Sequence, residues 1–110
     1  MSVVVPNVVK RYFEADADRN IDAIVALFSD NATVIDEGQE RRGMSEIREW
    51  QTGPASQYEY TVTVISEESL GDNRFRVTGR LDGNFPGGTA NLNFHFTLAG
   101  GLISYLKIAP

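Results

Sequence analysis

Asp36 is the residue of this sequence best suited to acid–base chemistry. It lies in a short segment, residues 33–37, in which successive side chains alternate between two faces, so that Val34 and Asp36 share one face. We expect that face to point toward the helices. A carboxylate among apolar side chains is a stronger base than one in water, so Asp36 is a candidate general base. The alternative is a structural acid whose oxygens are satisfied by backbone N–H groups or by an arginine.

Tyr12 is a candidate hydrogen-bond donor for the same chemistry. It belongs to an apolar stripe with the spacing of one helical face, formed by Val5, Val8, Val9, Tyr12 and Phe13. A donor beside Asp36 would stabilise an oxygen that gains negative charge while Asp36 removes a proton. The alternative is a core tyrosine whose hydroxyl finds some other partner.

The composition excludes several other kinds of chemistry. The chain has no cysteine and one histidine, which rules out thiol nucleophiles, cysteine zinc sites and catalytic metal sites built from two or three histidines of one chain. We therefore expect no metal and no cofactor. The net charge is −5, from 10 basic and 15 acidic residues, and the basic residues form no cluster. A nucleic-acid partner is therefore not expected.

A membrane segment and a leader are not expected either. No apolar run approaches the ~20 residues that a membrane-spanning helix needs. The first residues, Met1-Ser2-Val3, lack the charged segment and the long apolar stretch of a signal peptide. We therefore expect a cytoplasmic protein.

Three helices are predicted in the N-terminal half. The first covers residues 6–17, the second begins at the N-cap residue Asn20, and the third covers residues 45–51. Residues 29–31 are typical of a turn, and residues 38–43 of a polar loop.

The C-terminal half alternates with the period of strands. Predicted strands cover residues 58–64, 75–81, 91–98 and 102–108. Long antiparallel strands with one apolar face, together with helices near the N-terminus, predict an α+β fold in which the helices pack on one side of a curved sheet. The length predicts a single domain over residues 1–110.

The N-terminal half resembles a known family. The segments VVKRY, DAIVALFSDNATV and RRGMSEIREW are similar to those of ketosteroid isomerases and, more broadly, of SnoaL-like proteins in the nuclear transport factor 2-like superfamily. The resemblance implies a cone-shaped α+β barrel, in which three helices close over the concave face of a mostly antiparallel sheet and leave a pocket between. It places Tyr12 at the position of the isomerase oxyanion donor and Asp36 at that of the general base.

One functional position departs from the isomerase pattern. The isomerase has a second donor, a protonated aspartic acid on a late strand. The matching stretch here is NLNFHFTL, which puts Phe94 in that place. The resemblance therefore favours an enzyme that moves a proton next to a carbonyl, of isomerase, cyclase or dehydratase type. Hydrolysis with Asp36 activating water, and a non-catalytic ligand-binding or dimerisation module, remain open alternatives.

The expected ligand is a small hydrophobic or polyketide-like molecule. The residues predicted to line its pocket are Val34, Trp50, Tyr58, Phe75, Phe94 and Phe96. The opposite face of the sheet carries a mixed polar and aromatic set suited to a two-fold contact between copies of the chain. Its predicted members are Asn91, Asn93, His95, Thr97, Ile103 and Tyr105, and the expected assembly is a homodimer.

The missing late-strand acid leads to a first prediction. Loss of one oxyanion donor typically lowers the rate by about 10²–10³-fold. We therefore expect weak or no turnover of steroid enones by this protein, measured from the absorbance change on isomerisation. Turnover as fast as that of a dedicated isomerase would contradict the expectation.

Overall fold

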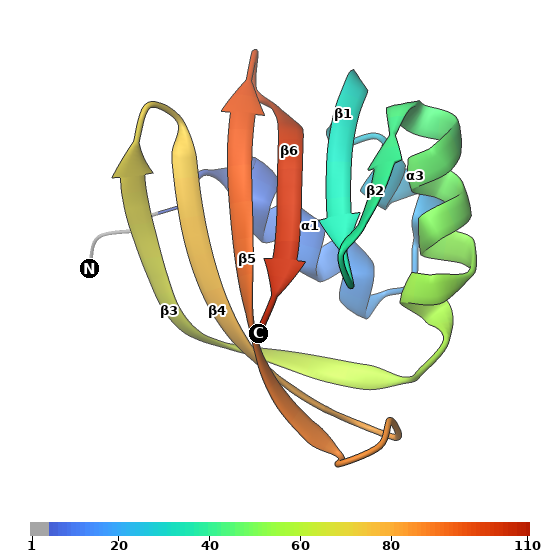
Figure 1. Ribbon diagram of the computed structural model, residues 1–110. Coiled ribbons are helices and arrows are strands. Elements are labelled where there is room, and N and C mark those ends of the chain that lie inside the picture. The colour runs from blue at the N-terminus through green and yellow to red at the C-terminus, as the bar shows by residue number, and fades with distance from the viewer. Residues whose placement is uncertain (1–4) are drawn as a thin grey trace.

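The computed structural model describes residues 5–110 and contains three α-helices and six strands (Figure 1). The helices are α1 (Asn7–Ala17), α2 (Ile21–Val25) and α3 (Gly43–Thr52), with a short 3₁₀ turn, η1 (Pro54–Ser56), after α3. The strands are β1 (Phe28–Asp36), β2 (Gln39–Arg42), β3 (Tyr60–Gly71), β4 (Arg74–Gly83), β5 (Thr89–Ala99) and β6 (Leu102–Ala109). Residues 1–4, on which the leader expectation depends, lie outside the described part.

All six strands form one mixed sheet in the order β2-β1-β6-β5-β4-β3. Only the β1–β6 pair is parallel, and the other four pairs are antiparallel. The long strands β3, β4 and β5 bend strongly, and α1 crosses the sheet while α3 stands beside β1 and β2 (Figure 1). The predicted α+β architecture, with three helices packed against a curved and mostly antiparallel sheet, is confirmed. Within residues 5–110 no helix is long and apolar enough to cross a membrane.

The segment predicted as a polar loop, residues 38–43, instead contributes strand β2. It pairs with β1 in a hairpin whose closing pair is Asp36 and Gln39. The two turn residues, Glu37 and Gly38, both have positive φ angles, 53° and 74°. Positive φ at both central positions is the pattern of a type I′ hairpin turn, and a glycine adopts it without strain. This tight turn places Asp36 at the end of its strand.

The predicted turn at residues 29–31 is likewise part of a strand. β1 begins at Phe28, which pairs with Ile103 of β6, and the register shifts before the next pair, Thr33 with Tyr105. The irregularity accommodates the polar residues inside a strand, which local turn propensity alone did not predict. The predicted N-cap at Asn20 is confirmed, because its side chain accepts a hydrogen bond from Ala23 N at 3.1 Å.

The outer-face prediction is wrong for Ile103. Ile103 is fully buried in the core. The β5–β6 register pairs Thr97 with Tyr105 but Leu98 with Ile103, so Ser104 is an extra residue on β6. Its hydroxyl donates a hydrogen bond to the Thr97 carbonyl at 3.1 Å. Such a bulge reverses the alternation of faces, which sends Ile103 inward while Tyr105 stays on the outer face.

Candidate active-site cavity

A cavity of about 570 Å³ opens between the helices and the concave face of the sheet. Its size is within the range of small-molecule sites, roughly 300–1,000 Å³. α1, α3 and η1 contribute to one side, and β4, β5 and the ends of β1 and β6 to the other. Leu81, Phe85, Leu92 and Phe94 make much of this lining apolar.

Three of the six residues predicted to line the pocket do so. Trp50, Tyr58 and Phe94 face the cavity, whereas Val34, Phe75 and Phe96 are absent from its lining. Val34 and Phe96 are instead almost completely buried in the core.

The aromatic side chains of α1 explain this difference. The ring of Tyr12 lies 5.6 Å and that of Phe13 5.9 Å from the ring of Phe96, in edge-to-face contacts. These contacts fill the half of the concave face around Phe96 and its cross-strand partner Phe75. The cavity therefore occupies the other half, over Leu92 and Phe94.

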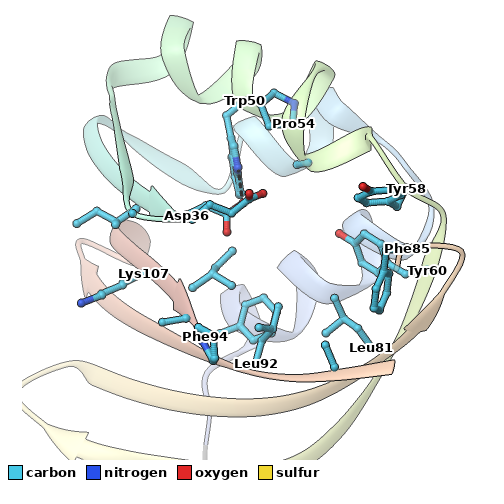
Figure 2. Close-up of a pocket in the computed structure, with 18 of the residues that line it drawn as sticks. Asp36, Trp50, Pro54, Tyr58, Tyr60, Leu81, Phe85, Leu92, Phe94 and Lys107 are labelled. Carbon is cyan, nitrogen blue, oxygen red and sulfur yellow. Dashed lines mark hydrogen bonds between the residues drawn. The ribbon is translucent and has the colours of Figure 1, made fainter. Parts of the chain in front are cut away.

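Asp36 lies in the cavity wall and is oriented by Trp50. The indole Nε1–H of Trp50 donates a hydrogen bond to Asp36 Oδ2 at 3.0 Å (Figure 2). Trp50 is only 2% exposed, and a buried indole N–H needs an acceptor. Within residues 5–110 the other carboxylate oxygen, Oδ1, makes no hydrogen bond. The arginine partner considered from the sequence is not at the carboxylate, because Arg41 donates to the Asp36 backbone carbonyl, at 3.4 Å.

Tyr12 lines the same cavity as Asp36 and keeps its proton. Burial raises the pKa of the Tyr12 hydroxyl well above its ordinary value, and the negative charges of Asp16 and Asp36 raise this pKa further. The hydroxyl is therefore neutral at any physiological pH and can donate a hydrogen bond. The structure thus brings together the two residues that the sequence singled out.

A second polar cluster, which the sequence analysis missed, supports the wall facing Asp36. The hydroxyl of Tyr60, a cavity-lining residue, donates to both carboxylate oxygens of Asp16, at 3.4 Å and 3.3 Å. The guanidinium of Arg19 lies 5.0 Å above the Tyr60 ring. Arg19 also donates to the backbone carbonyls of Ala55 and Tyr58, at 3.3 Å and 2.6 Å. Figure 2 shows Tyr58, Tyr60 and Phe85 gathered across the cavity from Asp36 and Trp50.

Asp16 could have been found by its place in the helical stripe. It follows Tyr12 by four residues, so both side chains lie on one face of α1. An acid in an apolar stripe is unusual and points to a buried carboxyl. Asp16 is 7% exposed, and its burial raises the pKa of its carboxyl, while Arg19 and the Tyr60 hydroxyl act in the opposite direction. Gln51, another cavity-lining residue that is buried, was also missed.

We also searched the described residues for side chains that could bind a metal ion. Over residues 5–110 no three His, Cys, Asp or Glu side chains gather as a metal site would need.

The raised pKa of Asp16 predicts a stability change with a definite sign. The unfolded chain releases this proton near the ordinary value of 3.8, whereas the folded protein releases it at higher pH. The bound proton therefore contributes to the free energy of unfolding below pH 3.8, and this contribution is lost as the pH rises through the folded-state pKa of Asp16. Asp16→Asn replaces the titrating carboxyl with a neutral amide, so this stability is no longer lost at neutral pH. The amide oxygen can still accept the hydrogen bond from Tyr60.

We expect Asp16→Asn to raise the free energy of unfolding at pH 7.5 and to give no such gain near pH 3, measured by urea denaturation. Asp18→Asn, at an exposed acid two residues along the chain, is the matched control. A less stable Asp16→Asn protein at pH 7.5 would show that the charged carboxylate is stabilising.

Known structures share this fold over nearly the whole chain. A candidate polyketide cyclase from Sinorhizobium meliloti is 30% identical, with a TM-score of 0.89 over 96% of this chain and 95% of that one. A protein with a ketosteroid isomerase-like fold from Catenulispora acidiphila, solved with trimethylamine, is 19% identical, with a TM-score of 0.84 over 97% and 87%. RV0760c from Mycobacterium tuberculosis, solved with estradiol-17beta-hemisuccinate, is 14% identical, with a TM-score of 0.80 over 94% and 91%.

The family assignment rests on sequence as well as on structure. A search of curated proteins gives no match. Residues 9–106, by contrast, match the SnoaL-like domain. This match covers most of the chain, and it confirms the resemblance inferred from the N-terminal motifs. The chain belongs to the SnoaL-like domain family.

Proposed function

We propose that this protein is a cofactor-independent enzyme that moves a proton next to a carbonyl group, as an isomerase, cyclase or dehydratase does. Asp36 is the general base and Tyr12 the hydrogen-bond donor. One observation carries the proposal: Asp36 and Tyr12 line the same apolar cavity. The buried Trp50 indole holds one carboxylate oxygen of Asp36, and the Tyr12 hydroxyl keeps its proton.

The chemistry of this pair can be written as a balanced proton transfer. Oδ1 of Asp36 takes a proton from the carbon beside the carbonyl, and the electron pair of that C–H bond moves onto the carbonyl oxygen. The Tyr12 hydroxyl donates a hydrogen bond to this oxygen as its charge grows. Asp36 then returns the proton and is regenerated. An isomerase returns it to a different carbon and a dehydratase to a departing oxygen. In a cyclase the enolate carbon bonds to a second carbonyl carbon, and the oxygen of that carbonyl takes the proton. The Trp50 indole keeps the carboxylate aimed throughout both steps.

The cavity lining supports a small hydrophobic or polyketide-like substrate. Phe94 and Leu92 form an apolar floor, while Tyr58 and Phe85 pack edge-to-face, with ring centroids 6.1 Å apart. An apolar ring system gains affinity from such walls, and the few polar groups set its orientation. The description of the Sinorhizobium neighbour as a candidate polyketide cyclase, and the steroid ester in the RV0760c structure, agree with this substrate class.

Replacement of Asp36 tests the proposal. In D₂O, the protein should accelerate exchange of the hydrogen beside the carbonyl in some member of a panel of apolar cyclic ketones, followed by NMR. Asp36→Asn should lower that rate by about 10²–10⁴-fold, because a positioned base contributes this much. Asp30→Asn, at an exposed acid of the same strand, should leave the rate unchanged.

Ketone binding without exchange above the buffer rate would contradict the proposed chemistry. That result would assign the chain to the ligand-binding alternative. Equal exchange by Asp36→Asn and the unchanged protein would also contradict it, because the base would then lie elsewhere.

We also propose that the protein is a homodimer formed through the outer face of the sheet. The helices pack on the opposite face, so Asn93, His95, Thr97 and Tyr105 are only half-buried and remain available. Burial and the neighbouring cations Arg76 and Lys107 lower the pKa of His95. His95 is therefore neutral at pH 7, which reduces the cost of burying it in a contact.

Light scattering at micromolar concentration tests the homodimer. We expect a mass near twice the 12.2 kDa of one chain. Thr97→Arg should shift the protein to monomer, because it places like charges face to face across a two-fold axis. Thr52→Arg, at an exposed position on α3, should not. A mass of one chain for the unchanged protein across this concentration range would contradict the proposal.

A further inference from the structure

The side-chain amide of Gln51 is the feature of the cavity that the proposed reaction leaves unused. Gln51 is 1% exposed and lines the cavity. Its Nε2 has no hydrogen-bond partner within residues 5–110. A buried donor without a partner destabilises a folded protein, and such groups are uncommon away from functional sites. An amide held in this state beside a ligand cavity can donate to a ligand.

The position of Gln51 on α3 brings its amide to the reacting end of the cavity. It directly follows Trp50, whose indole holds Asp36, so one turn of helix positions both residues. The Gln51 side chain is close enough to the Tyr12 hydroxyl to lower the Tyr12 pKa slightly, although its Nε2 makes no hydrogen bond with any described residue, and both residues line the cavity. The amide and the phenol are thus neighbouring neutral donors that face the same cavity as the Asp36 carboxylate.

The late strand offers no competing donor at this end of the cavity. Phe94 of β5 is 5% exposed, and its ring contacts the ring of Phe13 with centroids 5.0 Å apart. His95, the next residue, lies on the outer face, beside Arg76 and Lys107. The Tyr60 hydroxyl of β3 also lines the cavity, but it already donates to Asp16. Gln51, on the helical side, is therefore the candidate for a second donor to a ligand oxygen near Tyr12.

We propose that Gln51 Nε2 is the second oxyanion donor of this site, so that Gln51 and Tyr12 together bind an enolate or another planar oxyanion. This inference rests on the proposed function, because it assigns a hydrogen-bond donor to the substrate oxygen that becomes negatively charged when Asp36 removes the proton. A neutral amide is a weaker donor than a carboxylic acid, so it does not restore the missing acid in full. The assignment therefore agrees with the weak turnover of steroid enones that we predict from the sequence.

The test measures binding of a stable oxyanion. The probe is 4-nitrophenolate, whose absorbance reports binding, at a pH where the free phenol is ionised. Gln51→Met keeps the size and removes both polar atoms. Because a hydrogen bond to a charged group is lost, affinity should fall about 10- to 100-fold. Gln39→Met, at an exposed glutamine outside the cavity lining, should leave the affinity unchanged.

Stability separates a binding role from a structural one. If Gln51 awaits a ligand, Gln51→Met removes an unsatisfied donor and should raise the melting temperature, by about 4 °C or more. If Gln51 instead supports the fold, the same change lowers the melting temperature. An affinity within threefold of the unchanged protein, or a lower melting temperature, would overturn the proposal.

A second substitution and a neutral probe protect the test against misfolding. Gln51→Glu keeps the shape but places a carboxylate beside the oxyanion. The Gln51→Glu protein should no longer bind 4-nitrophenolate. It should still bind 4-nitroanisole, which is the uncharged methyl ether of the probe. Equal loss of both probes would overturn the assignment, because it would indicate a damaged cavity rather than a missing donor.

The same titrations distinguish this inference from the proposed function. Asp36→Asn removes a negative charge facing the oxyanion and should tighten 4-nitrophenolate binding. Failure of that effect counts against Asp36 as the facing base. Failure of the Gln51 effect in either background counts against Gln51 alone.

Discussion

The hydrogen bond from the Trp50 indole to Asp36 joins the helical and sheet layers at the cavity, and the site depends on it. Each partner resolves a problem of the other, because a buried indole N–H needs an acceptor and a carboxylate in an apolar wall needs a donor. The tight turn at Glu37–Gly38 and the short strand β2 reverse the chain directly beside Asp36 and lead into α3, which carries Trp50.

The polar groups of the cavity differ in charge in a way that suits proton transfer. Asp36 is the cavity-lining acid that Trp50 holds, while Tyr12 and Tyr60 are held neutral, because burial and nearby acids raise their pKa values. Asp16 stands behind Tyr60 and fixes the direction of its hydroxyl. Because the Tyr60 proton is donated to Asp16, charge generated on a substrate oxygen meets the neutral hydroxyl of Tyr12, and much of the remaining surface is apolar.

Periodicity predicted the three helices, the sheet and the placement of Asp36 and Tyr12 in one cavity, because each depends on which face of a regular element is apolar. It did not predict β2 or the inward position of Ile103, which depend on a hairpin turn and on one extra residue in β6. The buried state of Gln51 depends on how α3 lies against the sheet, which no local pattern contains. Asp16 was accessible to sequence reasoning, since an acid in an apolar stripe signals a buried carboxyl.

A crystal structure with a bound planar phenolate tests most directly the claim that a base and neutral donors converge on one end of an apolar cavity. We expect the phenolate oxygen within hydrogen-bond distance of the Tyr12 hydroxyl and of Gln51 Nε2. The ring should lie over Phe94, with a carbon beside the oxygen-bearing one facing Oδ1 of Asp36. A ring bound in the reverse direction, with its oxygen toward Tyr58 and Phe85 across the cavity from Asp36, would contradict the account.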